Sequence, residues 1–167
     1  MLLLDRDGVI NENREHYVRS WESFTFLPGA LQALADLTRG GYRLVVLTNQ
    51  SMVGRGLVSL ATVQDIHDRM CQAVAQAGGA ICDILVCPHA PDAGCRCRKP
   101  LPGLVLEARR RHGLPPDTAW FVGDHTTDVE AALAGGCRPV LLATGRGGRA
   151  QAEASARWGD AVLCLPD

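Results

Sequence analysis

The chain has 167 residues, of which 47% are hydrophobic and 21% are charged, and its formal net charge is -1. This length and apolar fraction suit one folded domain over residues 1–167 and exclude a disordered chain. The near-neutral charge disfavours a nucleic-acid-binding protein, which needs a basic surface. The apolar runs are too short to cross a membrane and no signal-peptide pattern is present, so we expect a cytoplasmic monomer without a nucleic-acid or membrane partner.

Short apolar runs alternate with amphipathic stretches along the chain. In chain order, the pattern predicts a strand over 2–5, a helix between 28–29 and 40–41, a strand over 42–48, a helix capped by Ser59, a strand over 81–87, a helix over 103–111 begun by Pro102, a strand over 119–123, a helix over 128–134 capped by Thr127, a strand over 139–143 and a weaker strand over 161–165. Residues 145–149 form a Gly/Arg-rich turn. This alternation predicts an α/β fold with a doubly wound, mainly parallel sheet.

Polar residues follow the ends of the expected strands. Asp5-Arg6-Asp7-Gly8 ends the first strand, Thr48-Asn49-Gln50-Ser51 the second, and Asp124 with Asp128 the fourth, while Lys99 comes after the third. Each piece alone is more often a solvated turn or a surface charge. Because ligands of such sheets gather at the carboxyl ends of the strands, we expect these four segments to form one site.

The residue types at these strand ends indicate a reaction. Three carboxylates would repel one another unless a cation held them, and oxygen ligands at an open edge suit Mg²⁺. Lys99 and the Thr48 hydroxyl supply charge and hydrogen bonds for phosphoryl oxygens. The implied chemistry is phosphoryl transfer.

The four segments resemble the four motifs of the haloacid dehalogenase (HAD) superfamily of phosphatases, over nearly the whole chain. The resemblance implies that Asp5 is the nucleophile of an aspartyl-phosphate intermediate and that Asp7 is the general acid and base. It also implies that Thr48 and Lys99 bind the transferring phosphoryl group. The implied Mg²⁺ ligands are Asp5, the Asp7 backbone carbonyl and Asp124, with Asp128 orienting them.

A second group of metal-ligating residues is Cys87, His89, Cys95 and Cys97. Four soft ligands at this spacing suit tetrahedral Zn²⁺, with a redox pair or unligated thiols as the alternative. Four protein ligands leave no open position, so the zinc is expected to be structural. Since Lys99 follows Cys97 closely, the zinc loop 87–97 would hold the phosphate-binding lysine in place.

The zinc loop and the following Cys-Arg-Lys-Pro resemble two branches of the superfamily, the heptose bisphosphate phosphatases and the histidinol-phosphate phosphatase domains. The segments 26–29, 54–56 and 102–103 favour the heptose branch, which implies removal of the C7 phosphate from a small phosphorylated sugar; histidinol phosphate is the alternative substrate. No segment is long enough for a separate cap domain, so loops must shape the pocket. Expected substrate contacts are Asn13, Tyr17, Asn49, Gln50, Ser51, Arg55 and Arg98.

Two other protein classes share parts of this pattern. A phosphoacceptor receiver domain also combines carboxylates, Thr and Lys, but its acceptor Asp ends the third strand, where this chain has Cys87. A zinc-dependent nucleic-acid-binding module would use the same zinc ligands but needs a basic surface. Turnover of p-nitrophenyl phosphate with Mg²⁺ would separate a phosphatase from both.

Overall fold

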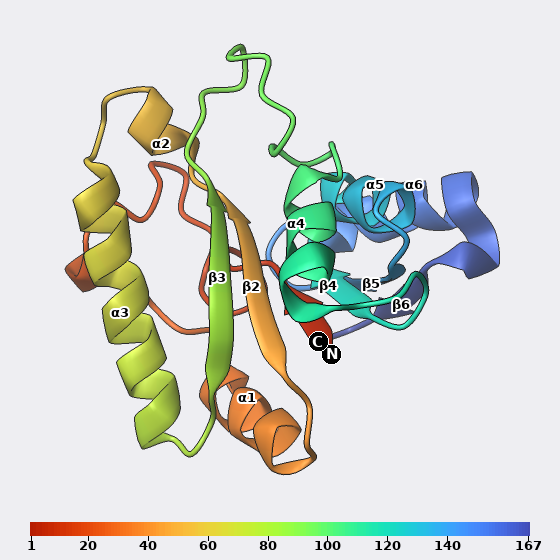
Figure 1. Ribbon diagram of the computed structural model, residues 1–167, viewed down its shortest axis with the longest axis horizontal. Helices are drawn as coiled ribbons and strands as arrows, with labels where there is room; N and C mark the ends of the chain where they lie inside the picture. The colour runs from red at the N-terminus through yellow and green to blue at the C-terminus, as the bar shows by residue number, and fades with distance from the viewer.

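Six parallel strands form the centre of the computed structural model, which describes residues 1–167 (Figure 1). The strands are β1 (Leu2–Leu4), β2 (Leu44–Asn49), β3 (Ile81–Cys87), β4 (Trp120–Gly123), β5 (Arg138–Leu142) and β6 (Leu163–Leu165). Their order in the sheet is β3-β2-β1-β4-β5-β6, and every neighbouring pair is parallel. The expected doubly wound α/β architecture is therefore confirmed, and the winding reverses between β1 and β4.

Helices lie on both faces of this sheet (Figure 1). They are α1 (Ala30–Arg39), α2 (Ser51–Gly54), α3 (Leu60–Gln76), α4 (Gly103–His112), α5 (Thr126–Ala134) and α6 (Gly147–Trp158), with two 3₁₀ turns, η1 (Trp21–Ser23) and η2 (Gly159–Ala161). Alternate strand residues point to opposite faces. In β1, Leu3 therefore packs in the core layer with α4 and α5, whereas Leu4 packs with α1 and α3.

The helix boundaries correct three sequence-based expectations. The N-cap of α5 is His125 and not Thr127, because Asp128 accepts a hydrogen bond from the His125 backbone N–H at 3.1 Å and closes a capping box. Pro102 is the N-cap of α4 rather than its first residue. Part of the expected turn 145–149 is the start of α6, whose small residue Ala154 packs against β5. In contrast, the Ser59 cap is confirmed, since its Oγ accepts from the Thr62 N–H at 3.0 Å.

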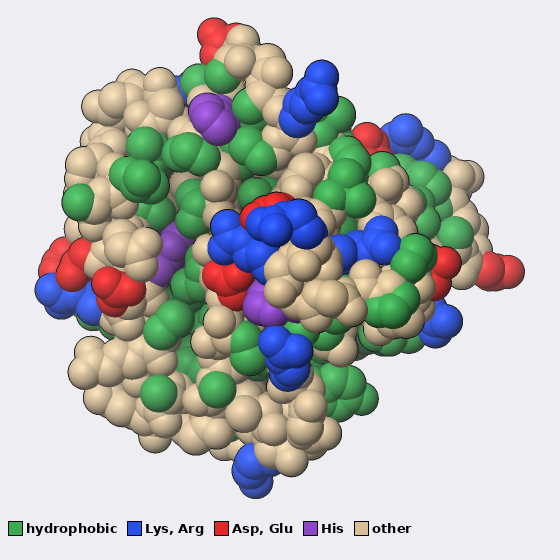
Figure 2. All heavy atoms as spheres, in the orientation of Figure 1, with side chains coloured by type: hydrophobic (Ala, Val, Ile, Leu, Met, Phe, Trp, Pro, Cys, Tyr) green, Lys and Arg blue, Asp and Glu red, His purple; other side chains and the backbone are tan.

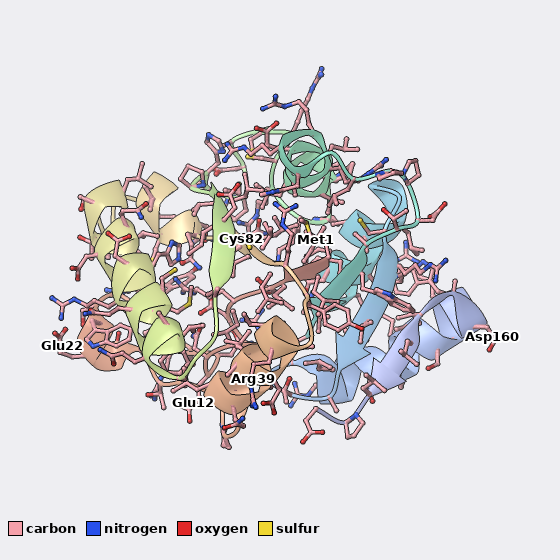
Figure 3. All side chains as sticks on the ribbon, turned by 60° about the horizontal axis from the view of Figure 1, so that its bottom comes forward. Met1, Glu12, Glu22, Arg39, Cys82 and Asp160 are labelled. Atoms are coloured by element: carbon pink, nitrogen blue, oxygen red, sulfur yellow. The ribbon has the colours of Figure 1, made fainter.

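The single cysteines outside the zinc cluster differ in environment. Cys137 is buried in the core, as a small apolar side chain would be. Cys82 is exposed on β3, an edge strand of the sheet (Figure 3). Cys82 is therefore an exception on this strand, whose other residues are half-buried or buried.

Two surface features lie outside the strand-end site. Charged side chains gather over α4 in Figure 2, where Glu107 pairs with Arg110 and Arg111, and Arg111 pairs with Asp83. The other feature is a cavity of about 740 Å³ that α1 and the uncovered face of β4–β6 line with mainly apolar side chains. No helix is long and apolar enough to cross a membrane.

Candidate active site

A cavity of about 300 Å³ opens at the carboxyl ends of β1, β2 and β4. Every residue expected to serve catalysis, Mg²⁺ binding or substrate binding lines it: Asp5, Asp7, Asn13, Tyr17, Thr48, Asn49, Gln50, Ser51, Arg55, Arg98, Lys99, Asp124 and Asp128. Only two of its 20 lining residues are hydrophobic. The cavity therefore suits a small, charged, hydrophilic ligand.

Three carboxyl groups meet on one side of this cavity. Asp5, Asp124 and Asp128 are buried, and one oxygen of each lies within 4.8 Å of the others. Lys99 joins two of them, because its Nζ lies 2.8 Å from Asp5 Oδ1 and 2.7 Å from Asp128 Oδ1. The Lys99 ammonium also donates to the Leu47 carbonyl at 3.1 Å, so β2 contributes to its position.

Burial and neighbouring carboxyl groups raise the pKa values of two residues of this cluster. Burial raises the pKa of Asp5 to about 8, against the opposing effect of Lys99 and with the support of Asp128 and Asp124. Burial also raises the pKa of Asp124 to about 6. A divalent cation would stabilise the charged carboxylates, so the chemistry of this donor set fits Mg²⁺.

Glycines allow the chain to approach these carboxylates closely. Gly8 has φ +90°, and a Cβ built on it would lie 2.1 Å from Asp124 Oδ2. Gly145 has φ +55°, and its Cβ would lie 2.2 Å from the same oxygen. Any side chain at either position would displace the Asp124 carboxylate, which explains why the turn after Asp7 and the turn after β5 both carry glycine.

The Asp7 carboxyl group has a different environment from that of Asp5. It accepts two hydrogen bonds from Arg6 Nη2, at 2.8 and 2.9 Å, and one each from Asn11 Nδ2 and Gln50 Nε2 at 2.9 Å. The charge and hydrogen bonds of Arg6 lower the pKa of Asp7 despite its burial. Asp7 is thus held as a carboxylate beside the cavity.

Residues 48–50, at the end of β2, position Thr48 and Lys99. Gln50 Nε2 donates to Thr48 Oγ1 at 2.8 Å and so fixes the hydroxyl that faces the cavity. The Asn49 amide pairs with the backbone of Lys99, accepting from its N–H at 3.2 Å and donating to its carbonyl at 3.1 Å. The amide oxygen and nitrogen of Asn49 thus both bind the Lys99 backbone, so Asn49 holds Lys99 in place.

Other polar residues form the mouth of the cavity. Asn13 donates to Asp124 Oδ2 at 2.7 Å, and Tyr17 adopts a left-handed backbone with φ 65°. Arg98 has a buried Nη1 without a hydrogen-bond partner, which a ligand anion in the cavity could supply. The Arg146 backbone N–H donates to Asp124 Oδ2 at 2.8 Å.

Sequence reasoning missed several lining residues, among them Arg14, His125 and Arg146. A signal for Arg146 was present, because the Gly/Arg-rich turn directly follows β5 and strand ends hold the site. Arg14 had no such signal. It lies in a long loop whose path depends on tertiary contacts.

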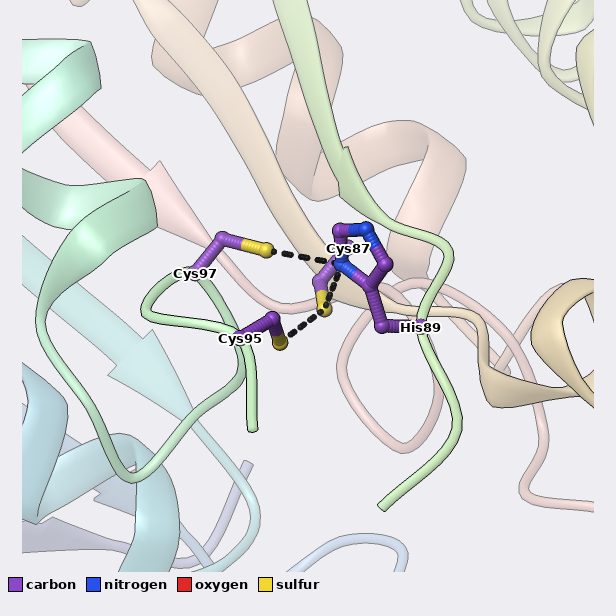
Figure 4. A group of neighbouring side chains, drawn as sticks. All are labelled: Cys87, His89, Cys95 and Cys97. Carbon is purple, nitrogen blue, oxygen red and sulfur yellow. Dashed lines mark hydrogen bonds between the residues drawn. The ribbon is translucent and has the colours of Figure 1, made fainter. Parts of the chain in front are cut away.

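Three thiols and one imidazole form a second cluster at the end of β3, whose last residue is Cys87 (Figure 4). Cys87 Sγ lies 3.7 Å from both Cys95 Sγ and His89 Nδ1, and His89 Nδ1 lies 3.2 Å from Cys97 Sγ. A tetrahedral zinc with Zn–S bonds of about 2.3 Å separates two sulfur ligands by about 3.8 Å. The cluster therefore fits Zn²⁺ with His89 Nδ1 as the nitrogen ligand.

The zinc loop packs tightly between α2 and α4. Gly54 donates its N–H to the Pro88 carbonyl at 2.7 Å, and a Cβ on Gly54 would lie 2.4 Å from the Ala90 nitrogen. A Cβ on Gly103 would lie 2.2 Å from the Arg96 carbonyl oxygen. These contacts set the course of the loop that carries Lys99 into the carboxylate cluster.

Comparison with known proteins points to one group of enzymes. A family model described as HAD-hydrolase-like matches residues 96–164. The chain is 44% identical to a D-glycero-beta-D-manno-heptose-1,7-bisphosphate 7-phosphatase of Pseudomonas putida, over 89% of this chain and 85% of the relative. It is 43% identical to a D-glycero-alpha-D-manno-heptose-1,7-bisphosphate 7-phosphatase of Mycobacterium tuberculosis, over 96% of this chain and 89% of the relative.

A solved structure is similar in both fold and sequence. It is the D,D-heptose 1,7-bisphosphate phosphatase from B. bronchiseptica complexed with magnesium and phosphate, with a TM-score of 0.94 and 42% identity. The match covers 99% of this chain and 92% of that one. The six-stranded architecture is thus shared along almost the whole chain.

Proposed function

The chain belongs to the heptose-1,7-bisphosphate 7-phosphatase family of HAD-like phosphatases, and we propose that it removes the C7 phosphate of D-glycero-D-manno-heptose 1,7-bisphosphate. The observation that carries the proposal is the Asp5 carboxyl group. It lies among Lys99 and two further carboxyl groups, in a polar cavity large enough for a sugar phosphate. We also propose that residues 1–167 act as one monomeric domain without a cap.

In the first half of the reaction, a carboxylate oxygen of Asp5 attacks the phosphorus of the C7 phosphate. A bond forms between Asp5 and phosphorus, and the bond from phosphorus to the C7 oxygen breaks. Because its lowered pKa leaves the resting Asp7 a carboxylate, Asp7 first takes up a proton from solvent. It then gives this proton to the C7 oxygen, so the sugar leaves as an alcohol. The product of this half is an aspartyl phosphate on Asp5.

In the second half, Asp7 takes a proton from a water molecule, whose oxygen attacks the same phosphorus. The bond to Asp5 breaks, inorganic phosphate leaves, and Asp5 is a carboxylate again. Asp7 thus acts first as an acid and then as a base, which divides one difficult hydrolysis into two easier displacements. The one-quarter exposure of its side chain toward the cavity supports this role.

Lys99 and Thr48 would hold the transferring phosphoryl group through its oxygens, by charge and by a hydroxyl hydrogen bond. The Asp5 and Asp124 carboxylates with the Asp7 backbone carbonyl would hold Mg²⁺, which when bound offsets the negative charge of the phosphate and the carboxylates. Asp128 pairs with Lys99 at 2.7 Å and would position it.

The zinc cluster would act on substrate binding indirectly, whereas residues at the cavity mouth would contact the substrate. Zinc at Cys87, His89, Cys95 and Cys97 would hold the loop that carries Lys99. Arg98 and Arg55 would bind the second phosphate, a role that the unpaired buried Nη1 of Arg98 supports. The remaining expected substrate contacts are Asn13, Tyr17, Asn49, Gln50 and Ser51.

The test compares catalytic efficiencies with Mg²⁺ on both anomers of the heptose 1,7-bisphosphate, on histidinol phosphate and on p-nitrophenyl phosphate. Both anomers are needed because the relatives include enzymes named for each. We expect one anomer to have the highest kcat/KM, with phosphorus NMR showing a heptose 1-phosphate as product. A higher kcat/KM on histidinol phosphate, or release of the phosphate at C1, would contradict the proposal.

A further inference from the structure

Two fully buried polar side chains lie behind Asp7 and are not used by the proposed reaction. Arg6, between the two motif aspartates, is 0% exposed, and His67 on α3 is 1% exposed. Arg6 follows β1 and lies on the face that α3 covers, because its guanidinium contacts His67 of α3. A buried arginine needs partners for its charge, so its contacts show what it does.

Arg6 connects α3 to Asp7. Its Nη2 donates to both Asp7 oxygens, at 2.8 and 2.9 Å, and its Nη1 lies 3.1 Å from His67 Nε2. An arginine only donates, so His67 Nε2 must accept and the ring proton must sit on Nδ1. Burial and the Arg6 charge lower the pKa of His67 to about 3, which keeps the ring a neutral acceptor.

No other polar group competes for the guanidinium. Its Nε is buried without a hydrogen-bond partner, and its Cζ lies 6.0 Å from the centroid of the Phe24 ring. The direction of the guanidinium is therefore determined by Asp7 on one side and His67 on the other. Removal of the His67 acceptor would leave Nη1 buried and unpaired.

We propose that Arg6 and His67 are positioning residues that set the plane and direction of the Asp7 carboxyl group for proton transfer to the leaving oxygen. This inference rests on the proposed function, in which Asp7 is the acid. Proton transfer requires the two oxygens to approach to about 2.6–3.2 Å, so a rotated carboxyl group transfers poorly. The guanidinium binds both carboxyl oxygens and is itself held by α3, so it opposes that rotation together with Asn11 and Gln50.

The readout is the dependence of kcat/KM on the leaving group. This parameter covers the steps up to formation of the aspartyl phosphate and loss of the leaving group. A sugar hydroxyl must receive a proton as it leaves, whereas p-nitrophenolate is stable without one. Misplacement of Asp7 should therefore slow the heptose bisphosphate much more than p-nitrophenyl phosphate, while a general loss of folding would slow both equally.

The experiment uses His67→Leu, which removes the acceptor, and His67→Gln, whose amide oxygen can replace Nε2. For His67→Leu we expect kcat/KM on the heptose bisphosphate to fall about tenfold, a part of the 10²–10⁴-fold effect of general acid catalysis, and that on p-nitrophenyl phosphate to stay within about twofold. His67→Gln should recover most of the loss. Met70→Leu, a buried change one turn further along α3, should leave the ratio of the two values unchanged.

Arg6→Lys provides a second route if His67→Leu does not fold, because one ammonium cannot bridge Asp7 and His67 as Nη2 and Nη1 of Arg6 do. Arg6→Lys should lower kcat/KM on the heptose bisphosphate more than on p-nitrophenyl phosphate, as His67→Leu does. The double variant Arg6→Lys/His67→Leu should lose no more activity than Arg6→Lys alone, since both residues act through Asp7. If kcat/KM fell equally on both substrates, or on neither, the positioning role of Arg6 and His67 would be overturned while the proposed function would stand. A wild-type protein that cleaves no sugar phosphate would contradict the proposed function as well.

Discussion

Asp5 and Asp7 stand two residues apart, yet the fold gives their carboxyl groups opposite surroundings. Asp5 faces Lys99 and two other carboxyl groups, and burial raises its pKa to about 8. Asp7 accepts four hydrogen bonds from Arg6, Asn11 and Gln50, and these bonds with the charge of Arg6 lower its pKa. The buried Arg6 lies between them in the chain and donates its side-chain hydrogen bonds to Asp7 and not to Asp5.

The contrast shows how one short motif supports two roles. The Asp5 side collects negative charge and fits a cation, which would lower the raised pKa of Asp5 and leave it a nucleophile. Around Asp7, by contrast, hydrogen-bond donors surround and orient one carboxyl group. Each side also depends on a distant segment: Asp5 on the zinc loop that carries Lys99, and Asp7 on α3 through Arg6 and His67.

Loss of the nucleophile should have the largest effect. Asp5→Asn keeps the shape of the side chain but an amide cannot attack phosphorus, so we expect kcat to fall by at least about 10⁴-fold. The melting temperature without Mg²⁺ should not fall, because burial already disfavours the charged form of Asp5. Steady-state kinetics and thermal unfolding of the purified variant measure both. Activity within tenfold of wild type would contradict the assignment.

Asp7→Asn should cost less, about 10²–10⁴-fold, because it removes proton transfer and leaves the nucleophile in place. Both formation and breakdown of the aspartyl phosphate should slow, since one carboxyl group serves both steps. Rapid-quench measurements of the phosphoenzyme separate the two rates, with the exposed Asp36→Asn on α1 as a control. Unchanged rates for both steps would remove Asp7 from the mechanism.

The dependence of Asp5 on the zinc loop can be tested with Cys95→Ser. Loss of a zinc ligand should lower the melting temperature and reduce kcat about a hundredfold, because Lys99 would shift by about 1 Å or more. Added Mg²⁺ should restore neither. The matched control is Cys82→Ser, which changes an exposed cysteine outside the cluster (Figure 3). Full activity and an unchanged melting temperature in a zinc-free variant would show that the loop does not need zinc.

The last prediction needs no substitution and concerns the competition between protons and Mg²⁺. In metal-free protein, burial raises the pKa of Asp5 to about 8 and that of Asp124 to about 6, and both must lose a proton to bind the ion. We therefore expect the apparent Kd for Mg²⁺ to fall as pH rises across this range, by about tenfold per pH unit for each proton released. Calorimetric titrations in buffers of different ionisation enthalpy measure the proton release, and a Kd independent of pH would contradict the expectation.

The sequence by itself determined the residues that follow the strands and the expected ligands of each metal. Asp5, Thr48 and Asp124 were predictable because parallel strands bring their carboxyl ends to one edge, and strand periodicity is a local property. The zinc ligands Cys87, His89, Cys95 and Cys97 were predictable because all four lie within eleven residues. All these residues lie where the sequence analysis expected, while their chemical roles stay predictions.

Only the tertiary structure decided what surrounds each of these groups. Asn49 lines the cavity as an expected substrate contact, and only the tertiary structure shows that its amide also pairs with the Lys99 backbone, 50 residues away. The Arg6–His67 contact spans 61 residues, and neither residue alone has a pattern that predicts it. The physical reason is that side-chain periodicity reports which face is buried, whereas hydrogen-bond partners across that face depend on how α3 and the zinc loop pack on the sheet.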